Sequence, residues 1–384
     1  MVSPAIAPQP ELFLDGPANA LLAAIEAEPH TPLGVAISAP GGYGKTALLD
    51  AIETAYQRAG FTVAKGHEAL TGAAAETVLV IDDAHLVDDA RLSELSRRAA
   101  AGQRFAVAYR PWPRRAALDA LAATLTRYGR MVALAPFTRE QTAAYLRRLA
   151  DDGVPATTVE FVHTHTAGIP RLVDRLGRAL VPPSATRTPD HTSIPPAAFT
   201  PIAVELDALD SDARRLLLAA AADIDTPIDV LGSLLVTDPE ALDTLLAVVR
   251  STGLVGPNDQ LPPLVKQAVA ALSPASRRVA VWQRVAEAQL RRGAPVLPLA
   301  RPLLALGATG EQAGAIFETA AEEALPHEPA LAAELFGAAA AAGRATAARQ
   351  ARAAALAGDL DTALRIADRL VTVEDPVQRA AGAA

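Results

Sequence analysis

Short apolar runs alternate with longer amphipathic stretches through the first third of the chain, and this alternation indicates its fold. The run at 77–81 is almost purely apolar or β-branched, as expected for a strand buried on both faces. The runs predict strands at 35–39, 61–64, 77–81, 105–109 and 131–134, and the stretches between them predict helices at 45–58, 86–100 and 114–127. Strands that alternate with helices in this way favour a parallel five-stranded sheet wrapped by helices, an α/β fold.

The rest of the chain is predicted to be helical, with one break rich in proline, serine and threonine that has the composition of a linker. Three helical segments from 201 onward precede a glycine-rich hairpin signal at 253–259, so we expect a winged-helix-like module. After 274 the sequence is rich in alanine. There, 331–336 and 361–367 resemble each other at about a 30-residue spacing, which fits a tetratricopeptide-like repeat or an ordinary helical bundle. The predicted parts are an arm (1–16), an α/β core (17–136), a helical lid (137–182), a linker (183–200), the winged-helix-like domain (201–273) and a helical repeat-like domain (274–384).

Composition narrows the classes of function. The 384 residues are enough for two to four domains of roughly 100–200 residues. Cysteine is absent, which excludes disulfides, thiolate metal sites and a cysteine nucleophile, and a cytoplasmic location is expected. No apolar run of about 18 residues is available to cross a membrane, so no membrane partner is expected. The net charge of −8 argues against direct DNA binding by this chain, because such binding depends on clustered cations.

A glycine-rich segment between the first predicted strand and the first predicted helix is the main candidate for chemistry. Residues 39–46 read Ala-Pro-Gly-Gly-Tyr-Gly-Lys-Thr, so Ala39 replaces only the first glycine of the G-x-x-x-x-G-K-[ST] pattern. Its backbone N–H groups would surround phosphates, Lys45 would face the β- and γ-phosphates, and Thr46 would bind Mg²⁺. An ordinary glycine-proline loop before a helix is the alternative. The predicted nucleotide-binding residues are Pro40, Gly41, Gly42, Tyr43, Gly44, Lys45, Thr46 and Ala47.

Two carboxylates follow the predicted strand 77–81, as in a Walker B segment. Asp82 is predicted to hold Mg²⁺ through water. Asp83 is predicted to orient or deprotonate the attacking water, and so to be catalytic together with Lys45. The alternative is that this pair caps the helix predicted to begin near 86.

Arg110 follows the predicted strand 105–109, whose carboxyl end should lie at the same sheet edge as the glycine-rich segment. It is therefore a candidate catalytic sensor of the γ-phosphate, with a solvated surface arginine as the alternative. His85 is interpreted as structural. His163 and His165 lack a nearby third ligand and are interpreted as surface or lid packing rather than a metal site.

Together these segments resemble the signal-transducing ATPases with numerous domains (STAND), and within them the large LuxR-type, MalT-like transcriptional regulators. The resemblance rests on 38–46, 81–86, 109–111 and 133–138, and covers roughly 12–290. Residues 168–170, Gly-Ile-Pro, resemble the G-x-P motif of the family's lid. The resemblance implies that Pro170 packs near the nucleotide base and that Arg171 acts as a second phosphate sensor. A preference for adenine over guanine is implied by the resemblance alone.

The resemblance implies a switch that binds ATP or ADP with Mg²⁺. ADP would hold a closed monomer, an inducer (a small molecule or a protein) would bind the helical tail, and exchange for ATP would drive self-association. Hydrolysis would be slow and would reset the switch. Because no LuxR-type DNA-binding segment follows the helical tail, we expect DNA contact only through a segment absent from this chain. The chain would then be the amino-terminal part of a longer transcriptional regulator, or would act through a partner.

The sequence departs from the family pattern at several positions. Pro17 stands where the family has an arginine, and Pro262 stands where it has a histidine that senses the β-phosphate. Only about ten residues separate Lys65 from the Walker B strand, too few for one peripheral helix. Two other functions therefore stay open. One is an AAA-type ATPase that loads or remodels a protein partner, suggested by the Gly-Ile-Pro-Arg lid segment. The other is a nucleotide-locked scaffold.

Overall fold

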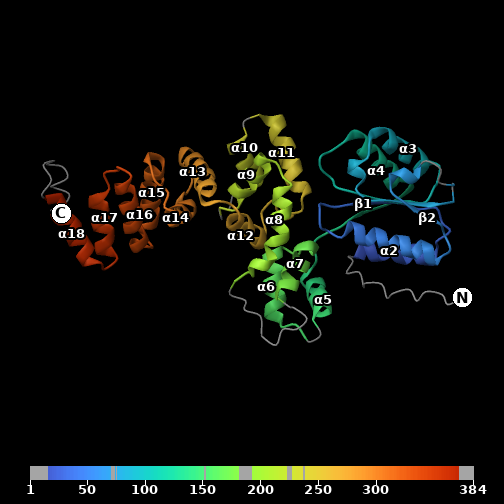
Figure 1. Ribbon diagram of the computed structural model, residues 1–384, viewed down its shortest axis with the longest axis horizontal. Helices are drawn as coiled ribbons and strands as arrows, with labels where there is room; N and C mark the ends of the chain where they lie inside the picture. The colour runs from blue at the N-terminus through green and yellow to red at the C-terminus, as the bar shows by residue number, and fades with distance from the viewer. Residues whose placement is uncertain are drawn as a thin grey trace. The chain divides into compact units, whose positions relative to one another are not determined.

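The computed structural model describes residues 16–70, 74, 76–150, 153–180, 193–222, 227–236 and 238–371. These residues form two compact units (Figure 1). The first contains residues up to Val204 together with Asp243–Val265, and the second contains Glu205–Leu242 together with the residues from Lys266 onward. The predicted winged-helix-like segment 201–273 contributes to both units, and its treatment as one module stays a prediction. Nearly all of the predicted arm and most of the predicted linker lie outside the described residues.

The first unit contains the sheet and the helices around it. Its elements are α1 (Gly16–Ala27), β1 (Gly34–Ser38), α2 (Lys45–Arg58), β2 (Val63–Lys65), η1 (His67–Leu70), β3 (Val78–Ile81), η2 (Ala84–Leu86), α3 (Asp89–Ala100), β4 (Phe105–Tyr109), α4 (Ala116–Tyr128), β5 (Gly129–Ala133), α5 (Arg139–Leu149), α6 (Ala156–Thr166), α7 (Pro170–Leu180) and η3 (Pro196–Ala198). Three helices cross from one unit to the other: α8 (Thr200–Asp207), α11 (Pro239–Ser251) and α12 (Pro263–Leu272).

The five strands form one parallel sheet in the order β2-β3-β4-β1-β5, which confirms the predicted α/β fold. Ser38, the last residue of β1, lies opposite Tyr109 of β4 and Ala133 of β5. The segments that follow these three strands therefore leave the sheet at the same edge. Ligands of open parallel α/β sheets bind at this carboxyl edge.

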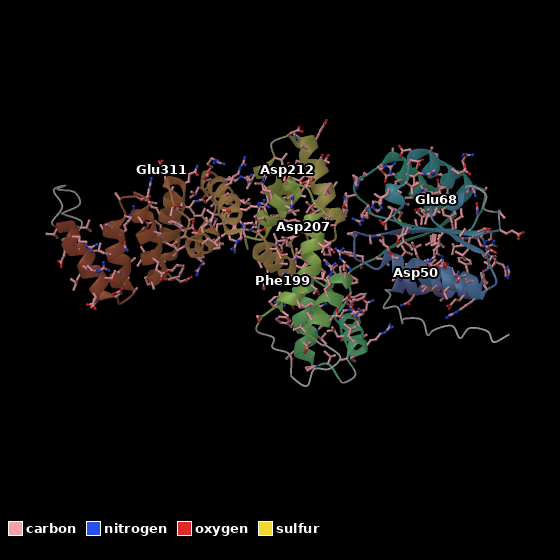
Figure 2. All side chains as sticks on the ribbon, in the orientation of Figure 1. Asp50, Glu68, Phe199, Asp207, Asp212 and Glu311 are labelled. Atoms are coloured by element: carbon pink, nitrogen blue, oxygen red, sulfur yellow. The ribbon has the colours of Figure 1, made fainter. Side chains whose placement is uncertain are left out.

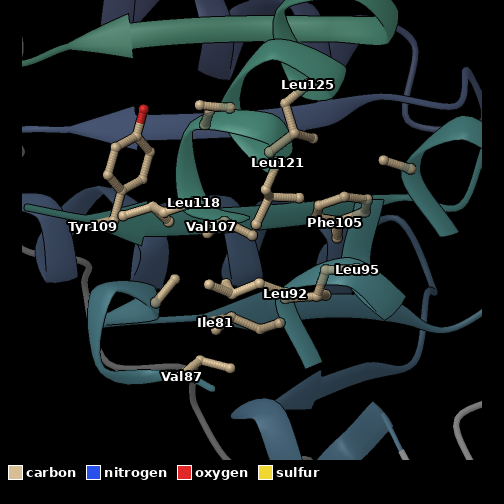
Figure 3. Packing of buried hydrophobic residues seen from close by; sticks show 14 of the residues in the cluster. Ile81, Val87, Leu92, Leu95, Phe105, Val107, Tyr109, Leu118, Leu121 and Leu125 are labelled. Carbon is tan, nitrogen blue, oxygen red and sulfur yellow. The ribbon is translucent and has the colours of Figure 1, made fainter. Parts of the chain in front are cut away.

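Alternating side chains of the strands fill two hydrophobic cores, one on each face of the sheet. Phe105, Val107 and Tyr109 of β4 pack against α3 and α4, as Figure 3 shows for the leucines of α4. Ala106 and Ala108 of the same strand face the core formed with α1 and α2. Figure 1 shows α2 on one side of the sheet, with α3 and α4 on the other. Burial on both faces explains why these strands are nearly continuous apolar runs rather than alternating ones.

Several predicted element boundaries differ from those in the structure. Strand β2 begins at Val63 rather than Phe61, and the Phe61 ring packs against His30 and Tyr56. Helix α4 begins at Ala116 rather than 114, and β5 spans Gly129–Ala133 rather than 131–134. Helix α3 begins at Asp89 rather than near 86, because Asp88 caps it by accepting a hydrogen bond from Arg91 N–H (2.9 Å). The alternative role for Asp82 and Asp83 as the cap of this helix is therefore wrong.

Helices α5, α6 and α7 occupy the segment predicted as a lid. The predicted cap is present. Thr138 Oγ1 accepts from Gln141 N–H (3.2 Å), and Gln141 Oε1 accepts from Thr138 N–H (2.8 Å). His163 Nδ1 lies 3.1 Å from Thr142 Oγ1, and the His165 ring stacks on Phe161. Both histidines thus pack within the lid, as predicted.

The hairpin predicted at 253–259 is a turn without strands, within a stretch that the structure describes throughout. Gly256 N–H donates to the Gln260 carbonyl (2.8 Å), and Arg250 holds the Asp259 carboxylate with two hydrogen bonds (2.9 and 2.6 Å). Pro262 and Pro263 follow at once, and proline has no N–H group to donate to a β-ladder. The wing of a winged helix is therefore not formed here.

The second unit is helical, in agreement with the prediction for its sequence. Its remaining helices are α9 (Ser211–Ala220), α10 (Ile228–Leu235), α13 (Ala275–Arg291), α14 (Leu297–Ala305), α15 (Glu311–Ala324), α16 (Pro329–Ala341), α17 (Ala347–Leu356) and α18 (Leu360–Val371). Trp282 Nε1 donates to the Leu218 carbonyl (2.8 Å), which joins α13 to α9, and Glu323 accepts from the first N–H groups of α14. Among the described helices, none combines the length and apolar character needed to span a bilayer.

A close backbone approach between β1 and β5 generates a prediction about stability. A Cβ atom on Gly129 would lie 1.9 Å from the carbonyl oxygen of Gly34, so Gly129→Ala must separate the two strands. We expect a loss of about 1–3 kcal/mol in unfolding free energy, the usual cost of overpacking a core. Gly16→Ala is the control, because a Cβ there has no neighbour within 4 Å. Equal denaturation midpoints for the two variants would contradict the pairing.

Candidate nucleotide-binding site

The glycine-rich segment leaves the carboxyl end of β1 and opens into the N-terminus of α2. Gly42 (φ 77°) and Gly44 (φ 93°) adopt left-handed conformations that favour glycine. Gly41 is required for a different reason, since a Cβ atom there would lie 2.5 Å from the Thr252 carbonyl oxygen. The three glycines therefore shape a backbone turn at a helix N-terminus, which is the local geometry of an anion site.

Lys45 lies under this turn, and its side chain is held by the turn's own carbonyl groups. Its Nζ donates to the carbonyl oxygens of Ala39 (2.9 Å) and Pro40 (2.7 Å), and the residue is only 6% exposed. Burial, assisted by the nearby Arg110 guanidinium, lowers the pKa of the Lys45 ammonium to about 8. A phosphate placed at this turn would offer the ammonium a stronger partner than two neutral carbonyls.

Thr46 and Asp82 meet where the sequence predicted a magnesium ion. Thr46 Oγ1 donates to Asp82 Oδ2 (2.6 Å), and Asp82 Oδ1 accepts from Asp83 N–H (2.8 Å). One hydroxyl and one carboxylate fit Mg²⁺, which usually keeps several waters and takes further oxygens from bound phosphates. The described residues include no cluster of three or more acidic or histidine ligands, so the ion would depend on those phosphates.

Asp83 stands beside this pair in an unusual backbone conformation. Its φ and ψ of 48° and 40° are left-handed, and its side chain is about half exposed. Strain of this kind in a residue other than glycine costs about 1–3 kcal/mol and concentrates at functional sites. The conformation directs the chain into η2 and leaves the carboxylate at the rim of the pocket described below.

The two predicted sensor arginines contact the same short segment, the carboxyl end of α11. Arg110 donates from Nη1 to the Ser251 carbonyl (3.3 Å), and Arg171 donates from Nη2 to the Thr252 carbonyl (2.8 Å). Gly41 N–H also donates to the Ser251 carbonyl (3.0 Å). Within the described residues, the buried Nε of Arg110 has no hydrogen-bond partner, so this guanidinium can accommodate a further acceptor.

One pocket of about 900 Å³ brings the predicted site residues together, within the 300–1,000 Å³ range of small-molecule sites. Of the predicted residues, Pro40 does not line it and contributes its carbonyl to Lys45 instead. The predicted residues that line the pocket are Gly41, Gly42, Tyr43, Gly44, Lys45, Thr46, Ala47, Asp82, Asp83, Arg110, Pro170 and Arg171. The structure thus collects predicted residues from four separate segments of the chain; their roles stay predictions.

Residues that no sequence motif marks also line the pocket, on α2 and on the segment that contains α5. Asp50 (Figure 2) and Thr54 continue the α2 face that begins with Ala47, at a helical spacing that the sequence already contained. Phe137 and Tyr145 line the lid side, with ring centroids 6.0 Å apart. No short motif marks these lid residues, because their positions depend on how α5 packs beside the sheet.

A charged network fixes the Tyr145 side chain. Tyr145 donates to Asp174 Oδ1 (2.5 Å), which also accepts from Arg178 Nε (2.6 Å). Burial and this anionic partner raise the pKa of Tyr145 to about 12. The phenol therefore stays protonated at neutral pH and ties α5 to α7 beside the pocket that it lines.

No protein-family model matches this chain, and no curated protein matches it. Solved structures are similar at low identity. The Thermotoga maritima RuvB Holliday junction branch migration motor is 17% identical over 64% of this chain and 89% of its own, with a TM-score of 0.37. The Aeropyrum pernix ORC2 protein, solved with ADPNP and ADP, is 15% identical over 71% of this chain and 96% of its own, with a TM-score of 0.41. Similarity at this level assigns no ligand, activity or partner to this chain.

The lowered pKa of Lys45 predicts how nucleotide affinity depends on pH. A bound phosphate favours the charged ammonium and so raises the Lys45 pKa above its free value of about 8. Affinity for ADP should therefore be highest below pH 8, where Lys45 is already charged before binding, and should fall as the pH rises above 8. Binding at pH 9 should take up close to one proton, measured by calorimetry in buffers of different ionisation enthalpy. Lys65→Gln, outside the pocket lining, should keep the same profile. Equal affinity and no proton uptake at pH 7 and pH 9 would exclude Lys45 as the phosphate contact.

Proposed function

We propose that this protein is an ATP/ADP-dependent regulatory switch of the STAND type, which controls transcription through a DNA-binding segment outside this chain. ADP would favour a closed monomer, and ATP would favour self-association. The helical second unit would carry the surface for a small-molecule or protein inducer. The pocket supports nucleotide binding because a glycine turn, a buried lysine and a hydroxyl–carboxylate pair converge on it.

The contact between the carboxyl end of α11 and the phosphate site is the observation that favours a switch over a simple binding site. Carbonyl oxygens of Ser251 and Thr252 accept from Gly41 N–H, Arg110 and Arg171. The carboxyl end of a helix carries a partial negative charge, so its carbonyl groups can take the place of an anion, although they bind cations less strongly than an anion does. Hydrogen bonds with a charged donor contribute about 1.5–3 kcal/mol each.

A γ-phosphate would compete with these carbonyls for the same arginines. It carries full negative charge, so both partners of the contact are charged, and a guanidinium can bind it through two parallel hydrogen bonds, whereas a carbonyl is a neutral acceptor. ADP lacks this group and would leave the α11 end in place. Helix α11 begins at Pro239 in the second unit and ends at Ser251 in the first, so the segment that ATP would release is continuous in sequence with the second unit. A ligand shifts a conformational equilibrium only by its differential affinity for the two states, and this contact would supply such a difference.

Slow hydrolysis would reset the switch. Gly41, Gly42 and Gly44 would present N–H groups to the phosphates, and Lys45 would neutralise their charge. A Mg²⁺ ion held by Thr46 and Asp82 would supply further charge neutralisation when bound. Asp83, at the pocket rim, would accept the proton of the attacking water.

Removal of the Lys45 charge tests the proposal directly. Lys45→Ala should abolish copurification with nucleotide and binding of ADP, while the far-ultraviolet circular dichroism stays unchanged. Asp83→Asn should keep binding, block hydrolysis and trap any ATP-dependent oligomer, measured by light scattering after chromatography. Full nucleotide stoichiometry in Lys45→Ala would refute the site assignment. Fast hydrolysis that a protein partner stimulates further would indicate a remodelling ATPase instead of a switch.

The glycine that follows α11 allows a sharper test of the switch. A Cβ atom on Gly253 (φ 73°) would lie 1.9 Å from the Gly41 carbonyl oxygen, so Gly253→Ala must push the α11 end away from the phosphate site. ATP affinity should rise relative to ADP affinity by about tenfold, which corresponds to ~1.4 kcal/mol. Gly293→Ala is a matched control, because Gly293 (φ 66°) also follows its helix by two residues but has no neighbour within 4 Å. An unchanged ratio of ATP to ADP affinity in Gly253→Ala would contradict the competition.

A further inference from the structure

His85 lies beside the carboxylate of Asp83, on which the proposed hydrolysis depends. It belongs to η2, the short turn after β3, and its side chain is only 8% exposed. Its Nδ1 lies 3.7 Å from Asp83 Oδ1. In the part of the chain that the structure describes, this buried Nδ1 has no hydrogen-bond partner. A buried polar atom without a partner costs about 1–3 kcal/mol, so its position calls for a role.

The backbone of His85 is anchored and its side chain is buried, whereas the Asp83 carboxylate is half exposed. Arg115 Nη1 donates to the carbonyl oxygens of His85 (2.9 Å) and Val87 (2.8 Å), and the neighbouring Ala84 is fully buried in the core. Asp83 is about half exposed and can turn about its side-chain bonds. A small rotation of the carboxylate would shorten the 3.7 Å separation to hydrogen-bond distance, whereas a movement of the ring would disturb the turn.

Burial favours a neutral His85 ring, and the nearby Asp83 carboxylate favours a proton on Nδ1. Burial lowers the pKa of His85 below its usual value, and the opposing effect of the Asp83 carboxylate is smaller. Arg110, Lys45 and Asp82 also act on the ring. A neutral imidazole carries one N–H group, and its neighbours select the nitrogen that holds it. An N–H group on Nδ1 faces the Asp83 anion, whereas an Nδ1 lone pair would be repelled by it.

We propose that His85 is a positioning residue for Asp83, to which it donates a hydrogen bond from Nδ1–H so that one carboxylate oxygen is held and the other faces the attacking water. This inference rests on the proposed role of Asp83. In the step, the water oxygen bonds to the γ-phosphorus, the bond from that phosphorus to the β–γ bridging oxygen breaks, and ADP and phosphate form. Asp83 accepts the water proton, and His85 keeps its own proton throughout.

Three substitutions of His85 distinguish a hydrogen bond that positions Asp83 from a side chain that only fills space. In His85→Asn the amide nitrogen can take the place of Nδ1, whereas in His85→Gln it reaches the place of Nε2 instead. His85→Leu fills the space without a donor. We expect kcat for ATP hydrolysis to stay within about threefold in His85→Asn and to fall roughly tenfold to hundredfold in the other two, below the full contribution of a general base. KM should stay unchanged in all three.

Two outcomes would overturn the inference: equal kcat in His85→Asn and His85→Gln, or wild-type kcat in His85→Leu. If Asp83→Asn itself hydrolyses ATP at the wild-type rate, the assigned role of Asp83 fails, which distinguishes that failure from one of His85. Should His85→Leu not fold, the comparison of His85→Asn with His85→Gln decides the question alone.

A spectroscopic measurement tests the inference without turnover. Nitrogen-15 shifts of the imidazole, assigned to His85 by the signal missing from His85→Asn, should show the Nδ1–H tautomer in the intact chain. Asp83→Asn should shift that signal. A neutral ring with its proton on Nε2 would overturn the proposal whatever the hydrolysis rates are.

Discussion

Parallel pairing of β1 with both β4 and β5 is the constraint on which the whole site depends. It aligns the ends of three strands. The glycine turn, Arg110 and the segment after β5 that leads to α5 therefore leave the sheet at the same edge. Side chains that alternate between the two cores hold this register, because a shift of β4 by one residue would move its large side chains into the core where Ala106 and Ala108 now pack. The positions of the site residues at this edge therefore depend on the packing of Phe105, Val107 and their neighbours in the core.

At that edge, a helix end occupies the donors that a phosphate would use. Backbone carbonyls at the carboxyl end of α11 accept hydrogen bonds from Gly41, Arg110 and Arg171. In the proposed switch, these neutral acceptors hold the two arginines until a charged γ-phosphate replaces them. The proposed coupling therefore depends on the difference between a neutral and an anionic acceptor rather than on any one residue.

The sequence alone predicted those features that arise from local patterns. The five strands follow from apolar runs, and Lys45, Thr46 and Asp82 follow from a motif in which each residue has a fixed place next to a strand or helix end. The contact of Gly41 with Ser251 joins residues about two hundred positions apart, and no periodicity marks it. The hairpin prediction failed because residues 253–259 form a turn instead, closed by the Gly256–Gln260 hydrogen bond and by the Arg250–Asp259 ion pair. His85 was interpreted as structural because its unpartnered nitrogen becomes visible only when Asp83 is placed beside it.

Hydrogen exchange at the end of α11 is the most direct measurement of the central claim, that ATP and the α11 end compete for the same donors. Peptides that cover 249–260, and the segment around Gly41, would be compared with Mg²⁺ and ADP and with Mg²⁺ and ATP, in the Asp83→Asn protein so that ATP persists. Competition predicts slow exchange of 249–260 with ADP and clearly faster exchange with ATP, while the segment around Gly41 stays protected in both. Equal protection of 249–260 with the two nucleotides would contradict it.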